Sequence, residues 1–201
     1  MNKFINFVKT MKYLSPMDFK IVNTQLETQF KEIRRRIFRL QSGGTIDSLI
    51  TIGANTENQI GASYVSLKQL ASNYVPNEPL ALLLWHEQKR EEQIIACFLL
   101  PDNLNVEKLT QLCNSCLSFE ISEYLGSIYL HKHPLFQEIS TAWLDSESPY
   151  LQIAALTALS RYFILHKGDG KISKEFYEKS LQREYKHKYV QLLAQRFQHN
   201  L

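Results

Sequence analysis

The stretch Ala142–Phe163, AWLDSESPYLQIAALTALSRYF, predicts the end of one helix, a short polar turn and a second, strongly apolar helix. Ser148 and Pro149 stand where a helix N-cap and a first helical residue are expected, because proline has no N–H to leave unpaired there. From Leu151 onward, apolar residues recur at helical spacing, and alanines among them allow a neighbouring helix to approach closely. We therefore expect this helix to be packed on more than one side.

The same signature recurs along the chain. Tyr150–Ala155, YLQIAA, is echoed by Tyr189–Ala194, YVQLLA, at an offset of 39 residues (150 to 189). A third copy is Gln93–Ala96, QIIA, which follows Trp85 as the central copy follows Trp143. A period near 40 residues built from paired helices is typical of HEAT-like arrays, whose units stack into a curved solenoid. The sequence thus predicts an all-α, HEAT-like repeat superhelix of antiparallel helix pairs. The alternative is chance similarity among helices rich in alanine and leucine.

Composition agrees with a folded helical chain. Hydrophobic residues make up 44% of the 201 residues and charged residues 21%, and only 7 Gly and 6 Pro are present, which disfavours a many-turned β fold. The net charge of +3 permits nucleic-acid binding without requiring it. We expect a monomer with a single helical-repeat domain over residues 1–201, divided into N-terminal helices and a loop (1–62) and the HEAT-like region (63–201).

Targeting signals are not evident in the sequence. No run of 18 apolar residues is present, so no membrane span is expected. The first residues, MNKFINFVKTMKYL, carry scattered lysines and no small-residue cleavage site, and they indicate a short helix rather than a signal peptide. Three cysteines, an odd number, suit reduced thiols. We therefore expect a cytoplasmic protein with no cofactor and no membrane partner.

Helical periodicity continues over the rest of the chain. Residues 15–41 are predicted as one long helix with an apolar stripe, ended by Gly43 and Gly44, and residues 54–63 have loop composition. No alternating strand pattern is found, so we expect about ten to twelve helices in mostly antiparallel pairs. The further predicted helices span 45–52, 66–74, 77–85, 89–100, 105–116, 118–130, 134–143, 173–183 and 186–197.

Cys113 and Cys116 form a CxxC motif. A redox role would place the motif at the start of a helix after a strand, and a zinc site would need two further ligands, for which His131 and His133 are the nearest candidates. Because the motif lies within a helical pattern, we interpret both thiols as small buried side chains. The two histidines, two positions apart, do not share a helix face and are interpreted as a solvated helix end.

One pair of carboxylates is a candidate for chemistry. Glu120 and Glu123 are three residues apart and therefore neighbours on one helix face, with Phe119 and Tyr124 beside them. A carboxylate next to an aromatic wall can stabilise a developing cation. Glu123 and Glu120 are thus the candidate catalytic residues, and Phe119 and Tyr124 the candidate wall. The alternative is a pair of surface glutamates.

Basic residues cluster at predicted helix ends and turns. In a stacked array the turns of successive units line the same edge, which would form a positive track able to neutralise phosphates. Each cluster can also be a solvated face balanced by glutamates. The candidate DNA-binding residues are Lys89, Arg90, Lys132, Arg161, Lys186 and Lys188.

From Ala81 to Phe163 the chain resembles the AlkD-like DNA alkylation repair family. Leu84–Gln93, LWHEQKREEQ, is similar to the family's Leu-Trp turn followed by an Arg-Glu-x-Gln helix start. Leu125–Pro134, LGSIYLHKHP, and Trp143–Ala155 are similar to two further family motifs. The resemblance implies a superhelix whose basic concave face holds duplex DNA. It also implies a glycosylase that removes cationic N3- or N7-alkylated purines with two Trp, one Asp and one Arg, without flipping the base into a deep pocket.

This sequence departs from the family at those catalytic positions. Counting back from Gly126 places Ser118 at the position of the catalytic Asp and Asn114 at that of the preceding Trp. Ile153 falls at the position of the Arg. A shift in register would bring Glu120 or Glu123 forward as the carboxylate.

The last repeat contains no Trp, and Arg196 or Gln195 lies nearest that place. We therefore predict a protein that binds duplex DNA on its concave face and excises alkylated purines weakly or not at all. The competing interpretation is a non-enzymatic scaffold whose concave surface binds a protein or peptide. A single positive groove would favour DNA, whereas a groove lined by Tyr, Phe and mixed charges would favour a protein.

Overall fold

The computed structural model describes residues 23–51, 55–166 and 170–200, and these residues form eleven α-helices, one π-helix, one 3-10 helix and no strand. The all-α prediction is confirmed. The part of the long predicted helix before residue 23 lies outside the described residues. In chain order the elements are α2 (Thr24–Arg39), α3 (Gly43–Thr51), α4 (Tyr64–Ala71), α5 (Glu78–His86), α6 (Arg90–Leu99), α7 (Val106–Asn114), α8 (Phe119–Tyr124), η2 (Leu125–Tyr129), η3 (Leu130–Lys132), α9 (Phe136–Leu144), α10 (Pro149–His166), α11 (Lys174–Leu181) and α12 (Lys188–Gln198).

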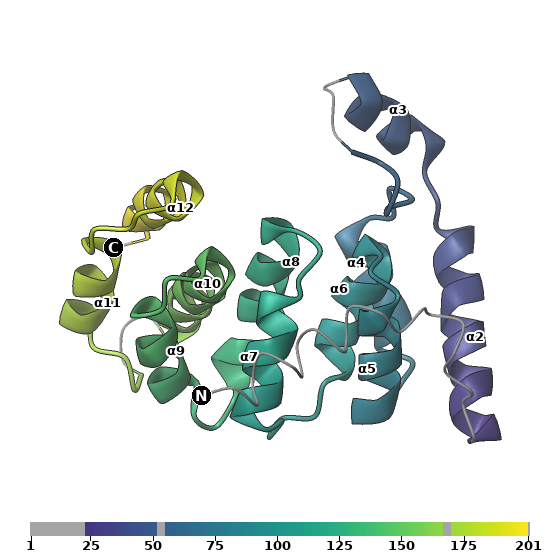
Figure 1. Ribbon diagram of the computed structural model, residues 1–201, viewed down its shortest axis with the longest axis horizontal. Coiled ribbons are helices and arrows are strands. Elements are labelled where there is room, and N and C mark those ends of the chain that lie inside the picture. Colours follow the sequence, from purple (N-terminus) through teal and green to yellow (C-terminus); the bar gives the residue numbers. More distant parts are fainter. Residues whose placement is uncertain (1–22, 52–54, 167–169, 201) are drawn as a thin grey trace, which may run out of the picture.

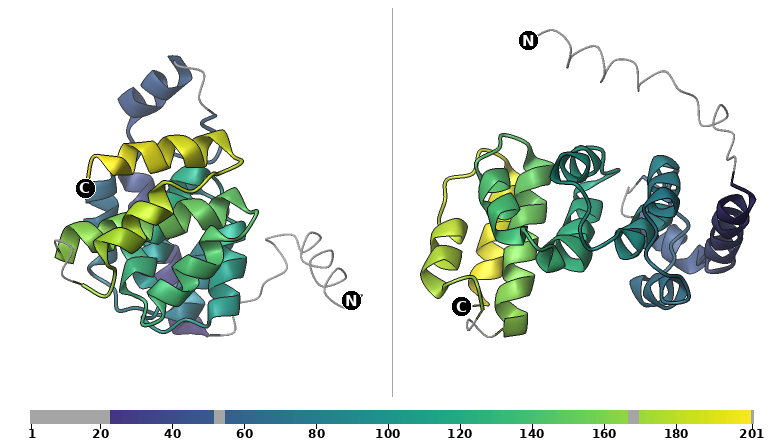
Figure 2. Two further views of the ribbon diagram at one scale, coloured as in Figure 1. Left: turned by 90° about the vertical axis from the view of Figure 1, so that its left-hand side faces the viewer. Right: turned by 90° about the horizontal axis from the view of Figure 1, so that it is seen from below.

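The helices stack in pairs into a curved array (Figure 1). α6, α8, α10 and α12 contact one another in turn and form the concave layer, and α5, α7, α9 and α11 lie on the outer side (Figure 1). α2 lies at the opposite end of the array from α11 and α12 (Figure 2). This arrangement is the helical-repeat superhelix that the sequence predicts, with two layers around a continuous core.

Helix α10 is the most deeply packed element of the array. Ten of its residues are buried, and it contacts α9, its partner, as well as α7, α8, η2, α11 and α12. Packing on several sides is what its apolar sequence predicts. Ser148 precedes the helix as expected, and its carbonyl accepts the N–H of Gln152 at 3.2 Å. Its hydroxyl, however, donates to Asn114 Oδ1 at 2.6 Å, so this side chain links α10 to α7.

The repeated sequence signature corresponds to a repeated interaction. In three helix pairs, a glutamine near the start of the second helix donates its side-chain amide to a carbonyl at the end of the first helix or in the turn. Carbonyls at helix ends lack a partner within the helix, and each amide supplies a hydrogen bond to such a carbonyl or to one in the turn. The bonds join Gln93 to Trp85 O (3.3 Å), Gln152 to Ser146 O (2.7 Å) and Gln191 to Tyr185 O (2.6 Å).

Both tryptophans have structural roles. Trp85 and Trp143 are buried, and both indoles donate to hydroxyls of the same segment around α7. The bonds run from Trp85 Nε1 to Ser115 Oγ at 2.9 Å and from Trp143 Nε1 to Thr110 Oγ1 at 3.2 Å. The two indoles therefore tie the helix pairs on either side to the outer helix between them.

Local signals in the sequence set most helix boundaries. Side chains of predicted N-cap residues accept backbone N–H groups of the first turn, as expected for Asn and Ser at this position. The bonds are Leu80 N to Asn77 (3.0 Å), Glu107 N to Asn105 (2.9 Å) and Phe176 N to Ser173 (3.1 Å). Gly43 and Gly44 differ from expectation, because they begin α3 and α2 has already ended at Arg39.

The predicted helix over residues 118–130 is helical but not uniform, since α8 widens into the π-helix η2 and then tightens into η3. Gly126 lies in the π-turn and faces α10. A Cβ at this position would lie 2.4 Å from the backbone oxygen of Ala154, so only glycine permits this approach. Single-turn π-helices occur frequently at functional sites.

The expectation of a solvated helix end at His131 and His133 is wrong, because both side chains are buried. The turn after η3 directs His133 inward, where its Nε2 lies 3.0 Å from Leu104 O and its Nδ1 accepts the N–H of Leu135 at 3.1 Å. Both ring nitrogens are thus hydrogen-bonded, which makes burial of this polar side chain tolerable.

We expect Gly126→Ala to destabilise the fold by about 1–3 kcal/mol, because the added methyl group would force η2 away from α10. The measurement is urea unfolding followed by far-UV circular dichroism. Gly44→Ala is the matched control: a Cβ there meets nothing within 4 Å, so its effect should stay within about 1 kcal/mol and favour the helix. Equal stabilities of Gly126→Ala and the wild type would contradict the close approach.

Candidate functional site

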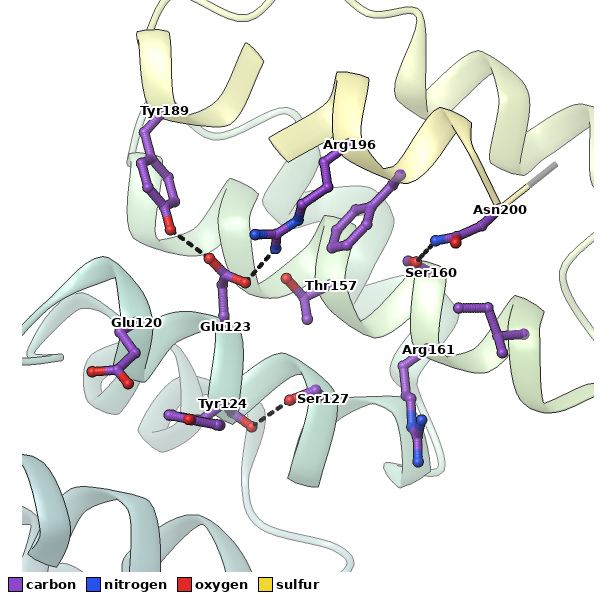
Figure 3. A pocket seen from close by; sticks show the side chains of 12 residues that line it. Glu120, Glu123, Tyr124, Ser127, Thr157, Ser160, Arg161, Tyr189, Arg196 and Asn200 are labelled. Atoms are coloured by element: carbon purple, nitrogen blue, oxygen red, sulfur yellow. Dashed lines mark hydrogen bonds and ion pairs between the residues drawn. The ribbon is translucent and has the colours of Figure 1, made fainter. Parts of the chain in front are cut away.

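A pocket of about 330 Å³ opens between α8–η2, α10 and α12, three consecutive elements of the concave layer (Figure 3). Both predicted carboxylates, Glu120 and Glu123, line it. Tyr189 and Arg196 reach it from α12, on which Lys188 was the predicted DNA-binding residue and Tyr189 was not predicted. Residues from three repeats therefore meet at one place, although they are far apart in the sequence.

Glu123 is held by two side chains of α12. Its carboxylate accepts hydrogen bonds from Tyr189 Oη at 2.5 Å and from Arg196 Nη2 at 2.5 Å (Figure 3). Burial, followed by the hydrogen bond to Glu123, raises the pKa of Tyr189 to about 12. The tyrosine therefore keeps its proton at neutral pH and remains a donor. This arrangement holds the Glu123 carboxylate in place inside the pocket.

Glu120 forms a different and more structural interaction. It receives a bidentate pair from Arg90, with Nε to Oε2 at 2.8 Å and Nη2 to Oε1 at 2.7 Å. Arg90 also donates to Ala62 O at 3.1 Å. Although burial alone would lower the pKa of Arg90, its hydrogen bond and charge pairing with Glu120 raise it. Glu120 thus ties α8 to α6, and of the two predicted carboxylates Glu123 is the one coupled to the α12 groups.

Of the two aromatic residues predicted to flank the carboxylates, Phe119 and Tyr124, only Tyr124 lines the pocket. Tyr124 lines the pocket and stacks on Tyr64, with ring centroids 5.3 Å apart and planes 3° apart. Phe119 is not part of the pocket lining, and its ring packs 4.9 Å from Tyr150 and 5.1 Å from the pocket residue Tyr189. Tyr189 is the aromatic residue that sequence reasoning missed. The 39-residue repeat, which aligns it with Tyr150, was the signal that could have found it.

The positions that align with the family's catalytic residues hold no comparable groups. Ser118 precedes α8 as its N-cap, Asn114 is exposed and accepts from Ser148, and Ile153 is fully buried. A carboxylate, a guanidinium and an aromatic ring nevertheless meet in this chain. They belong to Glu123, Arg196 and Tyr189, as described above. The same chemical types are therefore assembled from different positions.

The predicted basic residues occupy two edges of the concave layer instead of one. Lys89 precedes α6, and Lys186 and Lys188 stand at the start of α12, so these three lie at the N-terminal ends of concave helices. Lys132 ends η3 and Arg161 lies in the second half of α10, towards the opposite ends. The concave helices run in the same direction, so residues at their N-terminal ends and residues at their C-terminal ends lie on opposite edges of the layer. The prediction of a single track is therefore corrected.

Some of these cations are neutralised and others are not. Arg90 is paired with Glu120, and Lys186 pairs with Glu147 at 2.7 Å on the surface. Among the described residues, no ion pair involves Lys89, Lys132, Arg161 or Lys188. Unneutralised positive charge therefore remains on both edges.

The positive charge of this edge affects the pKa of His131. Burial, followed by the nearby positive charges of Lys132 and Arg161, lowers its pKa to about 4. Its Nδ1 is buried and has no hydrogen-bond partner among the described residues. The buried imidazole of His131 is therefore neutral at pH 7, in part because of the positive charge at this edge.

The three cysteines lie in the core of the array. Cys97, Cys113 and Cys116 are free and buried, and burial raises the pKa of the Cys97 and Cys116 thiols. The described residues contain no group of three or more His, Cys, Asp or Glu side chains placed to hold a metal ion. Over the same part of the chain, no helix has the length and apolar character needed to cross a membrane.

The lowered pKa of His131 makes a prediction about stability. As the pH falls from about 6.5 to about 4, the unfolded chain takes up a proton at this residue before the folded chain does, so the free energy of unfolding decreases. Replacement of His131 by Gln should remove this contribution, on the order of 2–3 kcal/mol across that window. Urea unfolding at a series of pH values gives the slope of the free energy of unfolding against pH for the wild type and for His131→Gln. Parallel slopes for the wild type and His131→Gln would show that the imidazole is not held neutral.

Comparison with known protein families gives one match. A family model described as DNA alkylation repair enzyme matches residues 33–184, which is more than half of the 201 residues. Comparison with curated proteins and with solved structures returned no significant match. The matched segment begins in α2 and ends just before α12, so it contains Glu120, Glu123 and the cations of α6 and α10. This chain therefore belongs to the DNA alkylation repair enzyme family.

Proposed function

We propose that this chain binds duplex DNA across its concave face, with the Glu123 pocket turned towards the duplex. The observation that carries this proposal is the presence of cations without carboxylate partners on both edges of the concave layer, with the pocket between them. Lys89 and Lys188 stand at one edge and Lys132 and Arg161 at the other. A helix of 18 residues such as α10 is about 27 Å long, so the two edges can engage phosphates of both strands.

Glu123 is the candidate for the chemical step, the release of a cationic alkylated purine. Such a base leaves readily with the electron pair of the glycosidic bond because it already carries positive charge. The protein then needs to stabilise the developing cation on the sugar until a water molecule adds to C1′ and loses a proton to the solvent. Glu123 supplies a carboxylate for this, and Tyr189 and Tyr124 supply ring faces beside it. Arg196 offsets the carboxylate's charge at 2.5 Å, which reduces the stabilisation available to a developing cation. We therefore propose weak base excision.

A second candidate function is the binding of a protein or peptide. The pocket is lined by Tyr124, Tyr189 and Phe197 together with carboxylates and guanidinium groups, and this mixture of rings and both charges favours a protein partner over a phosphate backbone. The two functions differ in their dependence on salt, because only phosphate binding releases condensed counterions.

The affinity for a short duplex should fall with a slope of log K against log salt on the order of −4, as several phosphates are neutralised. The double variant Lys132→Gln/Arg161→Gln should flatten this slope by about 2, since each cation lost removes about one phosphate contact. Fluorescence anisotropy with a labelled duplex gives both slopes.

Lys179→Gln is the matched control for that experiment. Lys179 lies on outer helix α11, where it pairs with Glu175 at 2.7 Å, so its removal should leave the slope unchanged. Absence of binding at low salt would refute the DNA proposal and favour the protein partner. Equal slopes for the control and the double variant would show that the Lys132–Arg161 edge does not contact phosphate.

Release of methylated purines from treated duplex DNA should exceed the spontaneous rate by a small factor. Glu123→Gln should return it to the spontaneous rate, because the amide keeps the shape of the side chain and removes its charge. Ser118→Ala, at the position aligned with the family's catalytic Asp, should leave the rate unchanged. Chromatography of the released bases provides the measurement. Loss of activity in Ser118→Ala but not in Glu123→Gln would contradict the role given to Glu123.

A further inference from the structure

One strongly basic surface takes no part in the proposed function. Helix α2 carries five basic and two acidic side chains, a net charge of +3 that equals the net charge of the whole chain. It is the first described helix and lies at the opposite end of the array from α12 (Figure 2). Its main contacts are with α4, α5 and α6, which belong to the array. The charge of the chain is therefore concentrated on a helix at one end of the array.

Helical geometry divides the residues of α2 into two faces. Ile33 and Ile37 are buried against the array. Arg35, Phe38 and Arg39 lie on the opposite side, because residues three and four positions apart are neighbours on one helix face. All three are exposed, and Phe38 is 63% exposed. We call the surface formed by Arg35, Phe38 and Arg39 the end face of α2.

The arginines of α2 differ in their pairing. Arg34 and Arg36, on the two flanks of the helix, each pair with a carboxylate, at 2.8 Å and 2.6 Å respectively. Among the described residues, neither Arg35 nor Arg39 forms an ion pair. The helix dipole accounts for a cation in the last turn, such as Arg39, but not for Arg35. The end face thus holds two unneutralised guanidinium groups with an exposed ring between them.

This combination matches single-stranded nucleic acid. Guanidinium groups bind phosphate oxygens through charge-assisted hydrogen bonds. An aromatic ring between them offers a surface on which a base can stack, and surfaces for single strands combine positive charge with such rings. The bases inside a duplex are already stacked on one another, so they present no free face to Phe38. The ring therefore favours unpaired bases over duplex DNA.

We propose that the end face of α2 binds a single-stranded DNA segment that continues beyond the end of the duplex. Phe38 stacks on one unpaired base, and Arg35 and Arg39 contact the flanking phosphates. α2 stands at one end of the array, where a strand leaving a duplex laid along the concave layer would pass (Figure 1). The inference rests on the proposed function for the duplex part alone, and it adds a ligand, unpaired DNA, that the family resemblance does not imply.

The test uses fluorescence anisotropy of the full chain with two labelled DNA molecules: a blunt duplex, and the same duplex extended by a single strand of about four nucleotides. The wild type should bind the extended duplex about tenfold more tightly, within the range expected for one stacked base. Phe38→Leu should abolish most of this gain, because leucine keeps an exposed apolar side chain but has no ring. Phe38→Tyr keeps the ring and should retain the gain.

The charges of the end face are tested by the dependence on salt. Arg35→Gln/Arg39→Gln should flatten the slope of log K against log salt for the extended duplex by about 1.4, because two phosphates of a single strand lose their partners. Arg36→Gln is the matched control: it lies on the same helix, but it is paired with Glu32 on a flank, so the slope should stay unchanged. None of these variants should change the affinity for the blunt duplex.

Three results would overturn the inference. They are equal affinities of the wild type for the blunt and the extended duplex, a full gain in Phe38→Leu, and Phe38-dependent binding to phosphatidylglycerol vesicles that is tighter than binding to the extended duplex. The last would identify the end face as a site for an anionic lipid surface.

A free oligothymidylate separates this inference from the proposed function. Binding of the blunt duplex without any gain from the extension refutes this inference alone. Binding of oligothymidylate that weakens in Phe38→Leu, together with no binding of the blunt duplex, refutes the proposed function alone.

Discussion

The structure depends on the close approach of α10 to its neighbours, and above all on the contact between Gly126 and the backbone of Ala154. A helix buried on several sides requires each adjacent element to come near its axis, and a side chain at residue 126 would prevent this. The same contact positions the pocket. Glu123 stands just before the π-turn and Thr157 one turn beyond Ala154, so the packing that stabilises the array also brings these two side chains to one cavity.

Much of the fold could be predicted from the sequence because its determinants are local. The caps at Asn77, Asn105 and Ser173 act within one helical turn, and the apolar stripe of α2 buries Phe30 and Ile33 as its spacing indicates. The repeat signature was also informative, because each copy carries a glutamine that satisfies a carbonyl within eight residues. Periodicity and capping need no knowledge of distant parts of the chain.

The candidate site was predictable only in part, because its contacts are distant in sequence. The Glu123 and Glu120 pair was identified from spacing, but their partners were not. Arg196 lies 73 residues from Glu123, and Arg90 lies 30 residues from Glu120. The curvature of the array decides which helices meet, and no local pattern contains that information. Burial of His131 was missed for a related reason, since the π-turn and the 3-10 turn rotate the chain away from the helical register assumed for it.

The proposed site uses residues other than those at the catalytic positions that the family resemblance implies. The family's catalytic positions hold Ser118, Asn114 and Ile153, yet a carboxylate, a guanidinium and aromatic rings converge nearby on the same concave layer. The concave layer supplies the framework on which the proposed Glu123 site is built.

The central claim is that the concave layer is the surface that meets DNA. Hydrogen exchange of the full chain with and without a short duplex tests it most directly, because protection reports contact helix by helix. The account predicts slower exchange in α8–η2, α10 and α12 on addition of the duplex, with no change in α5, α7, α9 and α11. Protection confined to the outer helices, with the concave helices unchanged, would contradict it.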